Sequence, residues 1–151
     1  MSASAIEIST DRNRLDLAYV HRYLSEQCYW ALGRSRDIVE KSITNSLCFG
    51  VYAGAQQIGF ARVVTDYATF AWLCDVFIDD ACRGQGLGKR LVETVIAHPE
   101  LQGLRNFILA TRDAHELYRG YGGFETLGTP DRWMARPRME CKIPSRELHE
   151  F

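Results

Sequence analysis

The chain has 151 residues and a formal net charge of −1, from 18 basic and 19 acidic residues. This length is typical of one domain, and the balanced charge argues against a protein that holds nucleic acid by bulk positive charge. The five cysteines form no C-x-x-C pair, so we expect neither a disulfide framework nor a metal site. The first residues lack the pattern of a signal sequence. No apolar run is as long as a membrane span, which needs about 20 residues. We therefore expect a cytoplasmic protein without membrane or nucleic-acid partners.

The first 45 residues favour a short strand followed by two helices. Residues 5–9 are expected to form the strand. Apolar residues then recur at helical spacing from about residue 10 to residue 30. Gly33 interrupts this pattern, and residues 36–45 predict a second helix with one apolar face.

The period of the pattern changes after residue 46. Residues 47–53, 57–65 and 69–78 are rich in strand-forming side chains and are separated by short turns, which is typical of an antiparallel meander. In the third of these strands the alternation places Asp75 on the face opposite Val76. A carboxylate among apolar neighbours is unfavourable unless it has a partner or a function.

The second half of the chain predicts helices over residues 84–97 and 114–121, a buried strand over 104–110 and a further strand from Phe124 onward. The predicted order is β-α-α-β-β-β-α-β-α-β, an α/β fold of the α+β type with a mixed, mostly antiparallel sheet flanked by helices. We expect one domain over residues 1–144, followed by a charged tail over residues 145–151.

The most informative segment is the glycine-rich loop Arg83-Gly84-Gln85-Gly86-Leu87-Gly88-Lys89, which joins a strand to a helix. Backbone N–H groups at a helix N-terminus bind anions such as pyrophosphate, and glycines allow close approach of the ligand. The loop is not a P-loop, because Lys89 is followed by Arg90 and Arg83 stands where the first glycine is required. The loop also does not match G-x-G-x-x-G, the pattern of dinucleotide-binding sites. That pattern occurs in a parallel βαβ unit, whereas this loop follows an antiparallel meander.

The R-x-x-G-x-G pattern of this loop, together with the later Leu117-Tyr118 and Gly123-Phe124 pairs, resembles the GNAT family of N-acetyltransferases. The resemblance covers roughly residues 5–136 and implies that the loop binds the pyrophosphate of acetyl-CoA. It also implies that the strand before the loop splays from its neighbour and pairs with the pantetheine arm. The cofactor-binding residues implied by the resemblance are Val76, Phe77, Ile78, Arg83, Gly84, Gln85, Gly86, Leu87, Gly88, Lys89, Asp113, Tyr118 and Tyr121.

By the same resemblance, Tyr118 is the acid that protonates the departing thiolate, although it is also placed to be a core aromatic residue. Asp75 is the candidate general base or the anchor of a cationic acceptor, and the alternative is a structural ion pair. Two departures from the family pattern occur. Asp113 stands in a segment where the family often has asparagine, and Gly122-Gly123 contains one glycine more than usual.

The acceptor pocket of the family is built from the first helices, which implies substrate-binding roles for His21, Tyr29, Trp30 and Arg34. Tyr29 and Trp30 can stack on a small amine, or they can form a helix-packing cluster. Arg34 can pair with a substrate carboxylate. His21 and Glu26 are further candidates for the base, and the segment Arg132-Trp133-Met134 is expected to close the other side of the pocket.

We therefore expect an acetyl-CoA-dependent N-acetyltransferase that acts on a primary amine of a small molecule by direct attack in a ternary complex. Its partners would be acetyl-CoA and the amine, and the protein would be a monomer or a homodimer. Two alternatives remain. One is a non-catalytic acyl-CoA-binding or sensing module, and the other is an acetyltransferase acting on protein lysines or N-termini.

Overall fold

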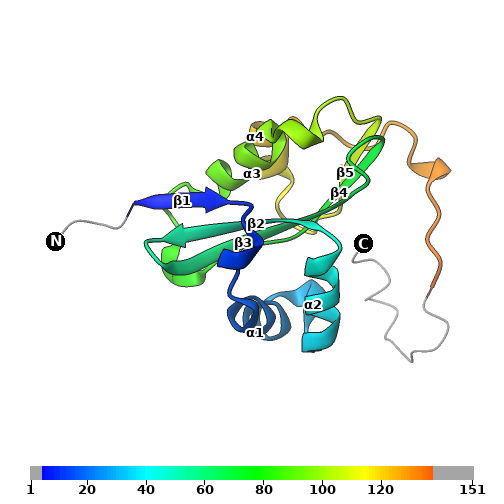
Figure 1. Cartoon of the computed structure of the whole chain (residues 1–151). Coiled ribbons are helices and arrows are strands. Elements are labelled where there is room, and N and C mark those ends of the chain that lie inside the picture. The colour runs from blue at the N-terminus through cyan, green and yellow to red at the C-terminus, as the bar shows by residue number, and fades with distance from the viewer. Residues whose placement is uncertain (1–4, 138–151) are drawn as a thin grey trace.

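The computed structural model describes residues 5–137, which form one five-stranded sheet with helices on both faces (Figure 1). The strands lie in the order β1-β2-β3-β4-β5. All neighbours are antiparallel except β4 and β5, which are parallel. The strands are β1 (Ile6–Ser9), β2 (Leu47–Ala53), β3 (Gln56–Thr65), β4 (Phe70–Ile78) and β5 (Asn106–Leu109). The α-helices are α1 (Leu17–Gln27), α2 (Arg36–Thr44), α3 (Leu87–Ala97) and α4 (His115–Gly122).

Two apolar cores lie on the two faces of the sheet. Helices α1 and α2 cover one face, where Val20, Leu24 and Val39 pack against Phe60 and Phe77 of the sheet. Helices α3 and α4 cover the other face, where the core includes side chains of both helices and of β2, β3 and β4. The predicted helix faces are the buried faces, as the 3.6-residue period requires, except that Ile38, expected on the apolar face of α2, is 58% exposed.

A bulge interrupts the alternation of β4 at Asp75. Phe60 pairs with Phe77 and Arg62 with Cys74, so Asp75 and Val76 together lie opposite a single residue of β3. Asp75 adopts the left-handed region, with φ of 52°, as the first residue of some bulges does. Because of the extra residue, Leu73 and Val76 both pack in the core under α3 and α4, although strict alternation would separate them. The expectation of regular alternation through this strand is wrong at this point, although Asp75 and Val76 do lie on opposite faces, as predicted.

The last strand of the sheet separates from its neighbour partway along. β5 pairs only with residues 70–73 of β4, and the rest of β4, from Cys74 to Ile78, has no partner on that side among residues 5–137. The chain leaves β5 at Leu109 and turns into α4. This separation leaves a free backbone edge on β4 and positions the site described below.

The predicted order of elements is confirmed as far as α4, but the strand predicted from Phe124 onward is wrong. Within the described residues, the segment after α4 forms no strand and contains only a 3-10 turn at Pro130–Arg132. Phe124 packs on the rings of Phe107 and Tyr118, which accounts for its apolar character. Pro130 has no N–H for a sheet ladder, which disfavours a strand there. The predicted boundary at residue 144 and the tail over 145–151 lie outside the described residues.

The first helix is shorter than predicted. Its N-cap is Asp16, whose carboxylate accepts a hydrogen bond from the Tyr19 N–H (3.0 Å). A separate 3-10 turn, Arg12–Arg14, precedes it and is capped by Asp11. Two N-caps in close succession therefore divide a segment that the apolar spacing alone presents as one helix.

Candidate active site

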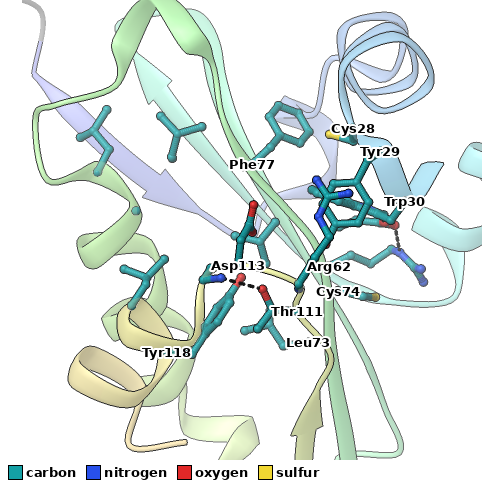
Figure 2. Close-up of a pocket in the computed structure, with 18 of the residues that line it drawn as sticks. Cys28, Tyr29, Trp30, Arg62, Leu73, Cys74, Phe77, Thr111, Asp113 and Tyr118 are labelled. Atoms are coloured by element: carbon teal, nitrogen blue, oxygen red, sulfur yellow. Dashed lines mark hydrogen bonds and ion pairs between the residues drawn. The ribbon is translucent and has the colours of Figure 1, made fainter. Parts of the chain in front are cut away.

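A cleft of about 780 Å³ opens where β4 and β5 separate. It is lined by the free half of β4, the glycine loop, the segment after β5, helix α4 and the turn that follows α1. Figure 2 shows Tyr118 and Asp113 on one side of this pocket and Tyr29, Trp30 and Arg62 on the other. Elements far apart in the sequence thus contribute to a single site.

The glycine loop forms one end of the cleft. Gly84 and Gly86 both have positive φ, 85° and 72°, and Gly86 is the N-cap of α3. No side chain of the described residues caps the first N–H groups of this helix. A Cβ placed on either glycine would have no described atom within 4 Å, so the space in front of these N–H groups is open to a ligand. The residues present therefore fit a bound pyrophosphate, which this end of a helix attracts.

All but one of the predicted cofactor-binding residues line the cleft; the exception is Gln85. Two positive groups accompany the loop. Lys89 lies with its Nζ 5.1 Å from the ring centre of Tyr121, and Arg83 forms an exposed ion pair with Asp80 (3.0 Å). The free edge of β4 at Val76–Ile78 continues from this end toward the middle of the cleft.

Tyr118 of α4 is buried, with 9% of its surface exposed, and its ring points into the pocket (Figure 2). Burial, with smaller contributions from the neighbouring Tyr29 and Asp113, raises the pKa of its hydroxyl to about 12. The phenol is therefore neutral over the physiological pH range and keeps its proton. Such a group can act as a proton donor but not as a base.

The two glycines that directly precede Phe124 are required for different structural reasons. A Cβ at Gly122 would lie 2.8 Å from the ring of Phe124, so no larger residue fits there without a shift. Gly123 has φ of 71° and is the C-cap of α4, where its N–H donates to the Tyr118 carbonyl. This left-handed position at a helix end favours glycine. The second glycine thus ends the helix that carries Tyr118.

Asp75 lies at the other end of the cleft with both carboxylate oxygens occupied. Trp30 Nε1–H donates to Oδ1 (2.9 Å), and Arg34 Nη1 and Arg62 Nε both donate to Oδ2 (2.9 and 2.8 Å). Burial alone would raise the pKa of Asp75, but the charges and hydrogen bonds of Arg34 and Arg62 outweigh it, and the pKa lies below its ordinary value. A carboxylate held in this way is a weak base. The geometry therefore favours the structural ion pair over the general base.

The predicted acceptor residues are only partly brought together. Tyr29, Trp30 and Arg34 line the cleft, whereas His21 and Glu26 do not. His21 Nε2 lies 3.1 Å from the Arg34 carbonyl oxygen and so supports the turn that carries Arg34. The segment Arg132-Trp133-Met134 does not line the cleft either, and Met134 is 97% exposed.

Both roles considered for Tyr29 and Trp30 are compatible with their geometry. Their rings meet edge to face, 5.0 Å apart, and the guanidinium of Arg112 lies 3.6 Å above the ring of Tyr29. The Arg112 backbone N–H also donates to the Tyr29 hydroxyl (3.3 Å). These contacts join the turn after α1 to the segment after β5. The two segments are far apart in the sequence but adjacent in space.

Arg62 is a residue of the cleft that the sequence did not lead us to expect. This residue interrupts the apolar run of β3, is 8% exposed and lines the cleft beside Asp75. The signal was present, because a charged residue in a buried strand requires a partner, and Asp75 was singled out by the same rule. Cys28, Cys74 and Thr111 line the cleft as well, but nothing in their local sequence pattern marks them.

Comparison with known proteins identifies the family. The sequence profile of the Acetyltransferase (GNAT) family matches residues 17–122. The chain belongs to the GNAT family. A crystal structure of a GNAT-family protein from Xanthomonas campestris pv. campestris is 45% identical to this GNAT protein, with a TM-score of 0.86 over 91% of this chain and 96% of that one.

Two further similarities agree with this assignment. A protein of Gibberella zeae that carries an acetyltransferase name is 29% identical in an alignment of length 133, and the match covers 74% of this chain and 74% of that protein. A Clostridium acetobutylicum structure with acetyl-CoA is 12% identical, with a TM-score of 0.65 over 92% of this chain and all of that one, and shares the fold. Within residues 5–137, this GNAT protein has no group of His, Cys, Asp or Glu side chains suited to a metal ion. None of the helices in that part is long and apolar enough to span a bilayer.

Proposed function

We propose that this GNAT protein transfers the acetyl group of acetyl-CoA to the primary amine of a small molecule, by direct attack in a ternary complex. The observation that carries the proposal is the composition of one cleft. An open helix N-terminus and a free strand edge lie at one end, a neutral phenol lies between, and an aromatic and cationic pocket lies at the other end. A cytoplasmic protein that is a monomer or a homodimer is proposed with it.

Acetyl-CoA would bind along the loop and the free edge of β4. The N–H groups at the start of α3, with Arg83 and Lys89, would hold the pyrophosphate, because the helix dipole and the unpaired donors favour an anion there. The unpaired backbone of Val76–Ile78 can hydrogen-bond the amides of the pantetheine arm as an added strand would. When bound, acetyl-CoA supplies the acetyl group as a reactive thioester.

The chain would assist the reaction in two ways. A backbone N–H of the free β4 edge can stabilise the negative charge that develops on the acetyl oxygen during attack. As the C–S bond breaks, Tyr118 can give its proton to the departing sulfur, because its phenol is buried, neutral and directed into the pocket. The amine attacks in its neutral form, and the proton that its nitrogen loses as the amide forms returns to the phenolate, which restores Tyr118. Together these steps require no covalent intermediate on the protein.

The aromatic lining of the cleft supports a small acceptor. Tyr29, Trp30 and Arg34 line a cleft whose walls come from both sides of the splayed strands, and such concave aromatic sites suit small ligands. A protein lysine or N-terminus remains an alternative acceptor. A module that binds acyl-CoA without turnover is the second alternative.

The proposal is tested by measuring thiol release from acetyl-CoA across a panel of small amines, first with the wild-type protein and then with Tyr118→Phe. We expect turnover with the wild type and a kcat at least about 100-fold lower in the variant, since general acid catalysis contributes roughly 10²–10⁴-fold. The KM for acetyl-CoA should change little.

Tyr67→Phe serves as the matched control, because Tyr67 is exposed and lies outside the cleft. It should retain the wild-type rate. Silence with every amine, alongside tight binding of CoA, would instead support the sensing module. Turnover with lysine-containing peptides but not with free amines would support the protein acetyltransferase.

A further inference from the structure

The cluster around Asp75 contains more positive than negative charge. Arg34 and Arg62 share one oxygen of a single carboxylate, and the other oxygen is taken by the neutral indole of Trp30. The side chains of Arg34, Arg62 and Asp75 are 22%, 10% and 2% exposed. Two guanidiniums and one carboxylate leave a net charge of +1 at the wall of the cleft.

Hydrogen-bond donors in this cluster also remain unused. Arg62 donates from Nε to Asp75 and from Nη1 to Ser46 Oγ (3.0 Å), and Arg34 donates from Nη1 alone. Among residues 5–137, the side-chain N–H groups on Arg62 Nη2 and on Arg34 Nε and Nη2 have no acceptor. None of these nitrogens is a buried atom without a partner, so their N–H groups are open to the cleft, which both arginines line. The cluster is therefore complementary to a second anionic group.

The other charges that line this end of the cleft do not reverse its sign. Arg112 adds a positive charge above the ring of Tyr29, and Asp113 is the other carboxylate that lines the cleft in the described part of the chain. Glu26 lies outside it. Asp75 already accepts from two arginines and from Trp30. A cationic acceptor would therefore place a third positive charge beside a single carboxylate, which is unfavourable.

We propose that the acceptor is a small amine that also carries a carboxylate, as an amino acid does, and that Arg34 and Arg62 bind this carboxylate. The proposal rests on the proposed acetyl transfer and specifies its substrate class. The planar guanidinium forms paired hydrogen bonds to a carboxylate, which gives direction as well as charge. In this arrangement Asp75 is a positioning residue that holds the two guanidiniums side by side, and it does not touch the reacting atoms.

The test compares amines that differ only by a carboxylate: phenylalanine with phenethylamine, lysine with cadaverine, and β-alanine with ethylamine. For each pair, kcat/KM is measured by thiol release with the wild type, with Arg34→Gln and with Arg36→Gln. Arg36 is an exposed residue at the start of α2 and lies outside the cleft, so it matches the charge change at a neighbouring position.

We expect at least one carboxylated amine to be preferred by about tenfold or more in the wild type and in Arg36→Gln, and this preference to fall about tenfold in Arg34→Gln. The two amines of a pair differ in the fraction that is uncharged, but this fraction is the same whichever protein is assayed. A change between proteins in the ratio of the two kcat/KM values therefore isolates the contribution of Arg34. Arg34→Lys should restore part of the preference, because it keeps the charge but loses the planar pair of donors.

A second measurement separates this proposal from the proposed activity. The same amines are titrated by calorimetry into protein saturated with CoA. Arg34-dependent binding of carboxylated amines without turnover would support the carboxylate site and contradict the acetyl transfer. Turnover of amines without a carboxylate at equal or higher efficiency would overturn the carboxylate site while the acetyl transfer stands. The carboxylate site is also overturned if no pair shows discrimination in either binding or turnover.

Discussion

At the scale of single residues, Asp75 shows how burial and pairing decide the state of a carboxylate. The Asp75→Asn variant would leave Arg34 and Arg62 in place but remove the charge that both share. Breaking a buried ion pair in this way is destabilising by about 3–5 kcal/mol. We therefore expect a clearly lower urea midpoint for Asp75→Asn at pH 7, whereas the exposed substitution Asp131→Asn should leave the midpoint close to that of the wild type.

The pH dependence of this difference follows from the lowered pKa of Asp75. The carboxyl group binds protons less readily in the folded state. Its contribution to the free energy of unfolding is therefore fully present at pH values above 3.8, the ordinary pKa of the group. That contribution is lost as the pH falls through the lower pKa of the folded state. Urea unfolding at a series of pH values should show the gap between wild type and Asp75→Asn constant at neutral pH and closing only below about pH 4. A gap that closes between pH 5 and 7 would contradict the ion pair.

At the scale of elements, the start of α3 depends on a left-handed glycine. In Gly86→Ala the backbone must hold φ near 72° with a Cβ present, which costs roughly 1–2 kcal/mol. The added methyl group would also project into the open space before the helix N-terminus, where the pyrophosphate is proposed to bind. We expect the KM for acetyl-CoA to rise about tenfold, measured by thiol release.

Gly103→Ala provides the matched control for this loop. Gly103 has the same φ of 72°, a Cβ there would also have no described atom within 4 Å, and it lies outside the cleft. This variant should lose similar stability but keep the wild-type KM. Equal changes in KM in the two variants would show that backbone strain, and not ligand contact, is responsible.

At the scale of the whole molecule, the cleft joins the two sides of the splayed sheet, so a ligand that fills it should stabilise the folded chain. A ligand present at 100 times its Kd adds about 2.7 kcal/mol to the free energy of unfolding. For a domain of this size, this corresponds to a rise of about 5–10 °C in Tm. Thermal unfolding with and without acetyl-CoA should show this rise, and Gly86→Ala at the same ligand concentration should show a smaller one. The absence of any saturable shift would contradict binding in the cleft.

Several features of this GNAT protein could be determined from the sequence because the signals are local. The spacing of apolar residues predicted the order of elements through α4, and the glycines at the start of α3 indicated the loop that we propose binds the pyrophosphate. Tyr118 followed from its Leu-Tyr motif by resemblance, and the structure places its ring in the cleft. These signals depend on helix periodicity and backbone dihedral preference, which neighbouring residues set.

The arrangement of the acceptor end was decided only by the tertiary structure. Asp75 meets Arg62, Arg34 and Trp30 across sequence separations of 13, 41 and 45 residues, and these pairings depend on the strand register and on the bulge that turns Asp75 toward the first helices. The absence of the predicted strand at Phe124 was also decided by the tertiary structure. Phe124 packs on Tyr118 and Phe107, and this contact accounts for its apolar character without a strand. The net charge of the chain is close to zero, but the folded protein has a local excess of positive charge around Asp75. Composition cannot reveal this excess, because only the folded register determines which charges share a site.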